Sequence, residues 1–139
     1  MKYYLAGPMS GIPHFNFPMF IAVATILRSR GYDIISPAEL DSPEDCAAAL
    51  ASLDGYQASD GTHTHTAKTW GDFLSRDVKI VADEVGGIIF LPGWQHSRGA
   101  KTEAFVGVQC KHEFYEWIEG ELHRLTTMDV IAMITEVPE

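Results

Sequence analysis

Apolar and polar positions along the chain predict strands and helices in alternation. Three short apolar runs, each stopped by glycine or proline, have the length of buried strands; they cover residues 2–6, 32–36 and 87–91. Three longer segments repeat apolar residues at helical spacing; they cover residues 17–30, 70–84 and 98–109. Strands that alternate with helices in this way are typical of a parallel sheet.

Residues 43–69 are interpreted as an insertion or lid. Residues 43–53 are alanine-rich with an acidic first turn, which predicts a helix. Residues 55–69 are polar and contain two histidines, His63 and His65, in a threonine-rich repeat. These histidines could bind a metal ion, but no third ligand stands at a convincing spacing. We therefore expect a solvated loop and no metal.

The C-terminal segment 111–139 predicts a β-hairpin and a last helix. Glu119-Gly120 is a turn signal, and the two hairpin strands are expected over 111–117 and 121–125, antiparallel to each other. Thr127 is expected to cap a helix over 128–135. We expect one α/β domain over residues 1–139, a Rossmann- or flavodoxin-like three-layer sandwich with a mostly parallel sheet of about four to five strands.

Composition narrows the choice of partners. The chain has 139 residues and a net charge of −9, so it lacks the basic footprint of a protein that binds intact nucleic acid. No apolar run approaches the roughly 20 residues of a membrane helix, and the N-terminal run is too short for a signal peptide. Cys46 and Cys110 lie far apart, and we expect two buried thiols in a reducing compartment. We therefore expect a cytoplasmic protein.

Three pieces of candidate chemistry converge if the sheet is parallel. They are a glycine- and proline-rich loop over 7–16, the carboxyl of Asp77, and a turn from Ser97 to Glu103. Ligands of such sheets bind beyond the carboxyl ends of the strands, and a Ser-x-Gly turn that opens a helix offers N–H groups to an anion. Two carboxylates that face one pocket favour glycosyl chemistry.

Phosphoryl transfer, hydride transfer and nucleophilic catalysis by serine are less favoured, because their sequence motifs are missing. The chain has no P-loop lysine, no Gly-x-Gly-x-x-Gly pattern and no nucleophile elbow. Each candidate also has a plain structural interpretation. Glu103 could be a solvated helix carboxylate, Ser97 a simple cap, and Asp77 a salt-bridged rim group. Trp94 could cover the sheet end or stack on a base, and His14 and His96 are expected to be exposed.

Two blocks of residues carry a family resemblance. The first is Tyr4-Leu5-Ala6-Gly7-Pro8-Met9-Ser10-Gly11, with Phe15-Asn16-Phe17-Pro18 and Phe20. The second is Trp70, Phe73-Leu74 and Arg76-Asp77-Val78, then Leu91-Pro92-Gly93-Trp94, Ser97-Arg98-Gly99-Ala100 and Glu103. In this order they resemble the nucleoside 2-deoxyribosyltransferase-like superfamily, and within it the DUF4406 branch of small phage and bacterial proteins. The chain departs from the superfamily at Gly86-Gly87, where an aspartate often stands.

The resemblance implies cleavage of the N-glycosidic bond of a (deoxy)nucleoside 5′-monophosphate. Glu103 would be the nucleophile, ionised near its helix N-terminus, and Asp77 would help proton transfer to the leaving base. The phosphate would bind Ser97 and the N–H groups of Arg98 and Gly99, with the Arg98 side chain adding charge. The other substrate-binding residues are expected to be Gly7, Pro8, Met9, Ser10, Asn16 and Trp94. No cofactor is expected.

Three functions stay open. The first is an enzyme, either a hydrolase that uses water or a transferase that uses a second base, with a modified pyrimidine as one possible substrate base. The second is a nucleotide-binding sensor or sponge that does not cleave its ligand, and the third is an interaction protein with a decayed site. The resemblance also implies a homodimer or larger homo-oligomer. We expect its interface on the C-terminal apolar residues Phe114, Tyr115, Trp117 and Ile118.

Overall fold

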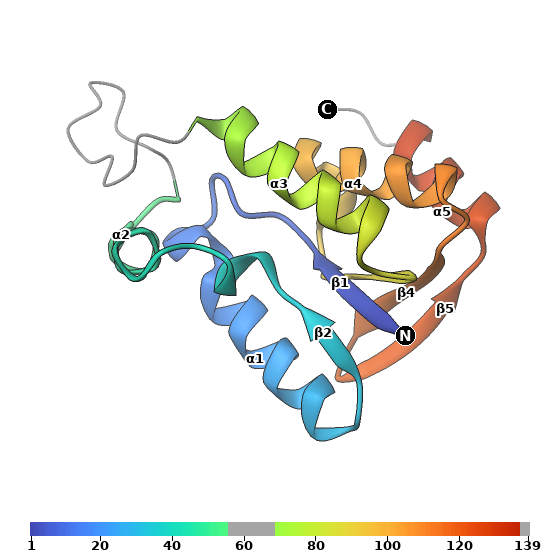
Figure 1. Cartoon of the computed structure of the whole chain (residues 1–139), viewed down its shortest axis with the longest axis horizontal. Helices are drawn as coiled ribbons and strands as arrows, with labels where there is room; N and C mark the ends of the chain where they lie inside the picture. Colours follow the sequence, from blue (N-terminus) through green and yellow to red (C-terminus); the bar gives the residue numbers. More distant parts are fainter. Residues whose placement is uncertain (56–68, 137–139) are drawn as a thin grey trace.

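The structure is a computed structural model that describes residues 1–55 and 69–136. Within these ranges five strands form one sheet in the order β2-β1-β3-β4-β5 (Figure 1). β1 is parallel to β2 and β3, β3 is parallel to β4, and β5 is antiparallel to β4. The strands are β1 (Lys2–Ala6), β2 (Asp33–Ile35), β3 (Gly87–Phe90), β4 (Glu113–Ile118) and β5 (Glu121–Leu125). This confirms a mixed α/β fold with a mostly parallel sheet.

Five α-helices connect or follow the strands in the described residues. They are α1 (Phe17–Ser29), α2 (Pro43–Ala51), α3 (Trp70–Asp83), α4 (Arg98–Gln109) and α5 (Thr127–Glu136). Three short 3₁₀ helices occur in the connections: η1 (Pro13–Asn16), η2 (Pro37–Glu39) and η3 (Trp94–His96). The predicted strands and helices are all present, with ends that shift by one or two residues. Part of the predicted lid, residues 56–68, lies outside the described residues.

The two faces of the sheet carry two apolar clusters. Alternate residues of a strand point to opposite faces, so Tyr4 belongs to one cluster and its neighbour Leu5 to the other. The first cluster includes side chains of α3, α4 and α5, and the second includes those of α1. Figure 1 shows α1 on one side of the strands and α3, α4 and α5 on the other. Every residue of β3 is buried, as its continuous apolar run predicts.

Gly86 and Gly87 have a structural reason to be glycines. A Cβ on Gly87 would lie 2.6 Å from the Tyr3 ring, and one on Gly86 would lie 2.9 Å from the Met1 side chain. A larger residue at position 87 would therefore press on the Tyr3 ring of the neighbouring strand β1, and one at position 86 would displace the Met1 side chain.

Three expectations about the fold are wrong. The last helix is capped by Thr126, not Thr127: the Thr126 hydroxyl accepts from the Asp129 N–H at 3.0 Å, and the Asp129 carboxylate accepts from the Thr126 N–H at 2.8 Å. The cysteines are not both buried, because Cys46 is half-buried and Cys110 is exposed. Phe114 and Trp117 belong to the core and so cannot form the expected interface, whereas Ile118 is exposed.

Within the described ranges, none of the helices combines the length and the apolar character that a bilayer-spanning segment needs.

Candidate functional site

A cavity of about 1300 Å³ opens beyond the carboxyl ends of β1 and β3. Its walls are the loop that follows β1, the helices α2 and α3, and the N-terminal turns of α4. β1 and β3 are also the point where the chain switches direction across the sheet, since β2 lies on one side of β1 and β3 on the other. Such switch points are where open α/β sheets bind ligands. The three predicted pieces of chemistry all line this cavity.

Glu103 lies in the cavity wall as a buried carboxyl. It is the sixth residue of α4, and only 6% of its surface is exposed. Tyr4, which is fully buried on β1, donates its hydroxyl hydrogen to Glu103 Oε2 at 2.5 Å. This bond fixes the carboxyl against the sheet. The interpretation of Glu103 as a solvated helix residue is therefore wrong.

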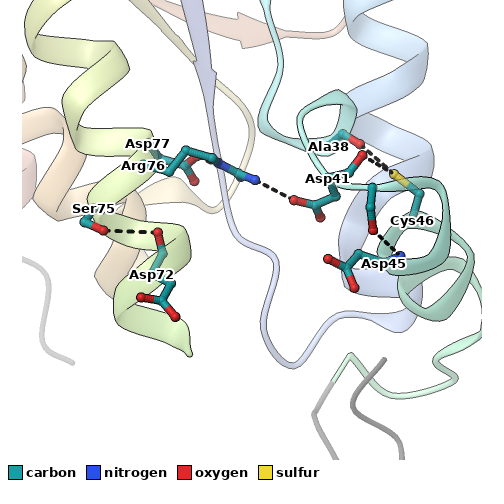
Figure 2. A network of polar contacts seen from close by, with 9 residues as sticks. Ala38, Asp41, Asp45, Cys46, Asp72, Ser75, Arg76 and Asp77 are labelled. Atoms are coloured by element: carbon teal, nitrogen blue, oxygen red, sulfur yellow. Dashed lines mark hydrogen bonds and ion pairs between the residues drawn. The ribbon is translucent and has the colours of Figure 1, made fainter. Parts of the chain in front are cut away.

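Asp77 lies on α3 and also lines the cavity. The neighbouring Arg76 donates its Nε–H to Asp77 Oδ1 at 2.9 Å and reaches with Nη1 to Asp41 Oδ1 at 2.6 Å. Figure 2 shows Arg76 extending from α3 toward Asp41, which follows η2 on the far side of the β1 segment. Asp77 thus forms a salt bridge and also lines the cavity. It fits both the interpretation as a salt-bridged group and the interpretation as a carboxyl in the pocket.

Burial governs the protonation of this cluster. The pKa of Glu103 is raised to about 8, chiefly by loss of water; the Tyr4 hydrogen bond and Arg76 oppose this rise, and the nearby Asp77 carboxyl adds to it. Burial likewise raises the pKa of Asp77, against the effect of the Arg76 guanidinium. This raised pKa opposes the prediction that Glu103 stays ionised at neutral pH. Glu103 lies beyond the first turn of α4, where the helix dipole has little effect.

The N-terminus of α4 forms a second wall of the cavity. Ser97 caps this helix, as predicted, because its hydroxyl accepts from the Ala100 N–H at 3.2 Å. Arg98 is exposed and lies over the Trp70 ring at 4.4 Å from the ring centroid. Ser97, Arg98 and Gly99 all line the cavity. A cation and a helix N-terminus therefore meet on this side.

The loop after β1 is held against α2. Its Gly11 N–H donates to the Gly55 carbonyl at 2.9 Å, and the His14 N–H donates to the Ser52 carbonyl at 2.7 Å. His14, Phe15 and Asn16 have φ between 52° and 61°, the left-handed region that non-glycine residues rarely adopt. These contacts hold Gly7, Pro8, Met9 and Ser10 in the cavity wall.

Two predicted site residues do not line the cavity. Trp94 is fully buried and stacks on Phe90 at a ring-centroid distance of 3.9 Å, so it covers the sheet end and is not placed to stack on a base. The sequence cannot separate these roles, because an aromatic residue after a strand suits either one. Asn16 donates its amide hydrogen to the Pro8 carbonyl at 3.0 Å and so positions the loop.

Two residues of the site were not predicted as such. Tyr4 lies 99 residues before its partner Glu103, and in the sequence it is only a buried strand residue. Asp41 follows η2 in a short polar turn that carries no motif. The available signal for Tyr4 was a phenolic hydroxyl in a strand that leads to the glycine loop, since a buried tyrosine hydroxyl usually has a hydrogen-bond partner.

The described residues contain no cluster of three or more His, Cys, Asp or Glu side chains that could hold a metal ion. His63 and His65 lie outside the described residues.

The fold and the cavity define the class: an α/β protein with a buried carboxyl, Glu103, and a partly buried one, Asp77, in a cavity beside the switch point of its sheet. The family model described as Domain of unknown function (DUF4406) matches residues 1–71, which is more than half of the chain, and the chain belongs to this family. The match covers β1, its loop and α2, whereas Asp77 and Glu103 lie beyond it. No curated protein and no solved structure matches the chain.

Proposed function

We propose that this protein cleaves the N-glycosidic bond of a (deoxy)nucleoside 5′-monophosphate through a covalent bond to Glu103. The observation that carries this proposal is a pair of carboxyls at the cavity wall: the buried Glu103, held by Tyr4, and the partly buried Asp77, held by Arg76. Retaining glycosidases use such a pair, one group as nucleophile and the other as acid and then base. Water or a second base then takes the sugar from Glu103.

The proton of the resting pair lies on the group that the reaction needs ionised. Glu103 holds a proton at neutral pH because its pKa is about 8; burial raises the pKa of Asp77 as well, but the Arg76 guanidinium opposes that shift. We infer that the proton passes from Glu103 to Asp77 when substrate binds. Ionised Glu103 then attacks C1′ while the glycosidic bond breaks, and protonated Asp77 gives its proton to the leaving nitrogen. One proton, shared by the pair, balances this step.

The α4 N-terminus supplies the phosphate end of the proposed site. Ser97, Arg98 and Gly99 line the cavity there, and backbone N–H groups at a helix start together with a guanidinium favour an anion. In this model the sugar lies against Glu103 and Asp77 and the base against the loop after β1. The sheet order 2-1-3-4-5 favours the flavodoxin-like arrangement within the α/β class, with an antiparallel last strand.

The test is incubation of the protein with a panel of nucleoside and deoxynucleoside monophosphates, followed by chromatography for free base. Wild-type protein should release base from at least one compound. Glu103→Gln should lower the rate by at least about 1000-fold, because it removes the nucleophile. Glu84→Gln is the matched control, since Glu84 is exposed at the end of α3, and it should be as active as wild type. Equal activity of all three proteins would refute catalysis by Glu103.

A binding protein that does not cleave its ligand is the second candidate function. The observation in its favour is the Tyr4–Glu103 bond, which leaves a protonated and almost fully buried carboxyl at the cavity wall. Native mass spectrometry of protein purified from cells separates the two functions. An intact nucleotide that remains bound, with no base release by the wild-type protein, would favour the sensor or sponge.

A further inference from the structure

Asp45 is a cavity-lining aspartate whose side chain has no partner among the described residues. Only 8% of its surface is exposed, and it lines the cavity from α2. In the described part of the chain, no donor lies within hydrogen-bond distance of its side-chain oxygens, although its backbone N–H donates to the Ser42 hydroxyl. A carboxylate accepts hydrogen bonds, so the oxygens of Asp45 are left to bind a donor from a ligand in the cavity.

Helix capping does not explain this aspartate. Asp45 and Asp72 occupy the same position, the third residue of α2 and of α3. Asp72 is exposed and folds back to accept from the Thr69 N–H at 2.8 Å, which completes a capping box. Asp45 makes no such return bond to Ser42. Figure 2 shows both residues, with the Asp45 carboxylate on the side of α2 that faces the β1 segment and α3.

Asp41, another carboxylate on this wall, already has a cation beside it. Asp41 accepts from Arg76 at 2.6 Å, and that guanidinium also binds Asp77. Asp45 therefore differs from Asp41 in having no cation of its own within the described chain. Ala48 and Ala49 follow on the same helix and line the cavity as well, which gives a planar ring an apolar surface beside the carboxylate.

The charges of the cavity orient an anionic ligand. Arg98 and the start of α4 attract a phosphate, whereas Asp45 on α2 repels it. A nucleoside monophosphate in this cavity would therefore turn its phosphate to α4 and its base to α2. The base edge that meets an ionised carboxylate must supply a hydrogen-bond donor. A carbonyl oxygen at that place would repel it.

We propose that Asp45 recognises the base of the ligand, and that this base carries an exocyclic amino group, as in cytosine or adenine. The proposal rests on the proposed function for the identity of the ligand as a nucleotide. It does not rest on bond cleavage, because a binder would need the same donor. Asp45 is thus a specificity residue of the cavity.

The test compares ligands that differ only in an amino or a carbonyl group. Binding of 2′-deoxycytidine and 2′-deoxyuridine 5′-monophosphates, and of the adenosine and inosine pair, is measured by titration calorimetry with wild-type protein. The amino member of a pair should bind at least about 10-fold more tightly, because its amino group donates to the Asp45 carboxylate, whereas a carbonyl oxygen in the same place repels it. Asp45→Asn should abolish or reverse this preference, since an amide can donate to a carbonyl.

Asp72→Asn is the control for a change at the same helix position, and it should keep the wild-type preference. If Asp45→Asn does not fold, the wild-type comparison still decides, because equal binding of the paired ligands refutes the proposal. Weak binding of all four nucleotides would refute both this inference and the proposed function. An amino preference without release of base from any ligand would support Asp45 recognition and refute cleavage. Release of base with no amino preference would refute recognition by Asp45 and support cleavage.

Discussion

Glu103 is a residue whose chemistry is set by burial more than by its place on α4. Its neutral form is favoured in the folded chain up to a pKa of about 8, while the unfolded chain releases the proton near the usual 4.5. The folded state therefore binds this proton more tightly than the unfolded state. The resulting stabilisation is complete below pH 4.5 and is lost as the pH rises through about 8.

Glu103→Gln should remove this pH dependence. The amide keeps the shape and can still accept the Tyr4 hydroxyl, but it carries no charge at any pH. We expect the variant and the wild type to unfold at similar urea concentrations near pH 5, and the variant to be more stable above pH 8, by an amount on the order of a few kcal/mol. Urea unfolding from pH 5 to pH 9 checks this. Parallel stability curves for the two proteins would show that Glu103 ionises normally.

Tyr4→Phe should change the pKa of Glu103 and the stability of the protein while leaving the other residues of the cavity in place. The hydroxyl lowers the pKa of Glu103, so its loss should raise that pKa further and leave a buried carboxyl unpaired. We expect a loss of about 1 to 3 kcal/mol in the free energy of unfolding. Tyr3→Phe is the matched control, since Tyr3 packs edge-on against Tyr32 and Tyr115 and its ring would remain. Equal stability of the two variants would contradict the Tyr4–Glu103 bond.

The residues that the sequence could place are those whose role is local. Ser97 and its helix follow from a cap ahead of an apolar pattern, and both are confirmed. Tyr4 and Asp41 act through partners far away in the chain, so no local pattern could reveal them. Trp94 was predicted at the site because a tryptophan beside a polar turn suits a ligand or a core. Its contact with Phe90 resolves the choice.

At the scale of elements, Arg76 connects α3 to the turn before α2. The Arg76–Asp41 pair joins two walls of the cavity, and the exposed fractions of its side chains are 25% and 11%. The strand and helix order was predictable because each apolar run is short and ends at glycine or proline. The Arg76–Asp41 pair was not predictable, because it depends on how α3 and the turn before α2 are placed in space. The Arg76–Asp41 pair is less exposed than a surface ion pair but is not fully buried.

Asp41→Asn should therefore loosen the α2 wall. We expect faster hydrogen exchange of α2 amides and a loss on the order of 1 to 2 kcal/mol in stability. The control is Glu39→Gln, which breaks the more exposed pair with Arg28 and should cost less. Mass-detected hydrogen exchange of peptides from α2 and from α5 measures both effects. Unchanged exchange in α2 would show that Arg76 does not hold this wall.

Substitutions at the start of α5 test which threonine caps this helix. Thr126→Ala should lower the free energy of unfolding by about 1 kcal/mol, because it removes the hydroxyl that caps α5. Thr127→Ala should have a smaller effect, since Thr127 is the first residue inside the helix. Thermal unfolding of the two variants compares them directly. A larger loss of stability for Thr127→Ala would show that Thr127, and not Thr126, caps α5.

At the scale of the whole molecule, the sheet brings together residues from both ends of the chain. β1 supplies Tyr4, α3 supplies Asp77 and α4 supplies Glu103, and all three meet at the switch point of the sheet. The DUF4406 match covers only the first of these elements. The proposed reaction therefore depends on the fold as a unit, and its pH dependence should report the shared proton of the pair.

The rate of base release should follow a bell-shaped pH profile. It should fall above about pH 8, where the pair loses its proton and no acid remains for the leaving base. It should also fall in acid, where both carboxyls are protonated and Glu103 cannot attack. Rates from pH 4 to pH 10 measure this profile. A rate that keeps rising above pH 9 would contradict a proton held by Glu103 and Asp77.

The most direct measurement is the search for a sugar bonded to Glu103. Wild-type protein is mixed with the nucleotide from which it releases base, quenched in acid within the first turnover, digested and mapped by mass spectrometry. The proposed mechanism predicts the mass of a (deoxy)ribosyl 5-phosphate on the peptide that contains Glu103, and no adduct in Glu103→Gln. Release of base with an adduct on another residue, with no adduct at any quench time, or at an equal rate in Glu103→Gln would contradict it.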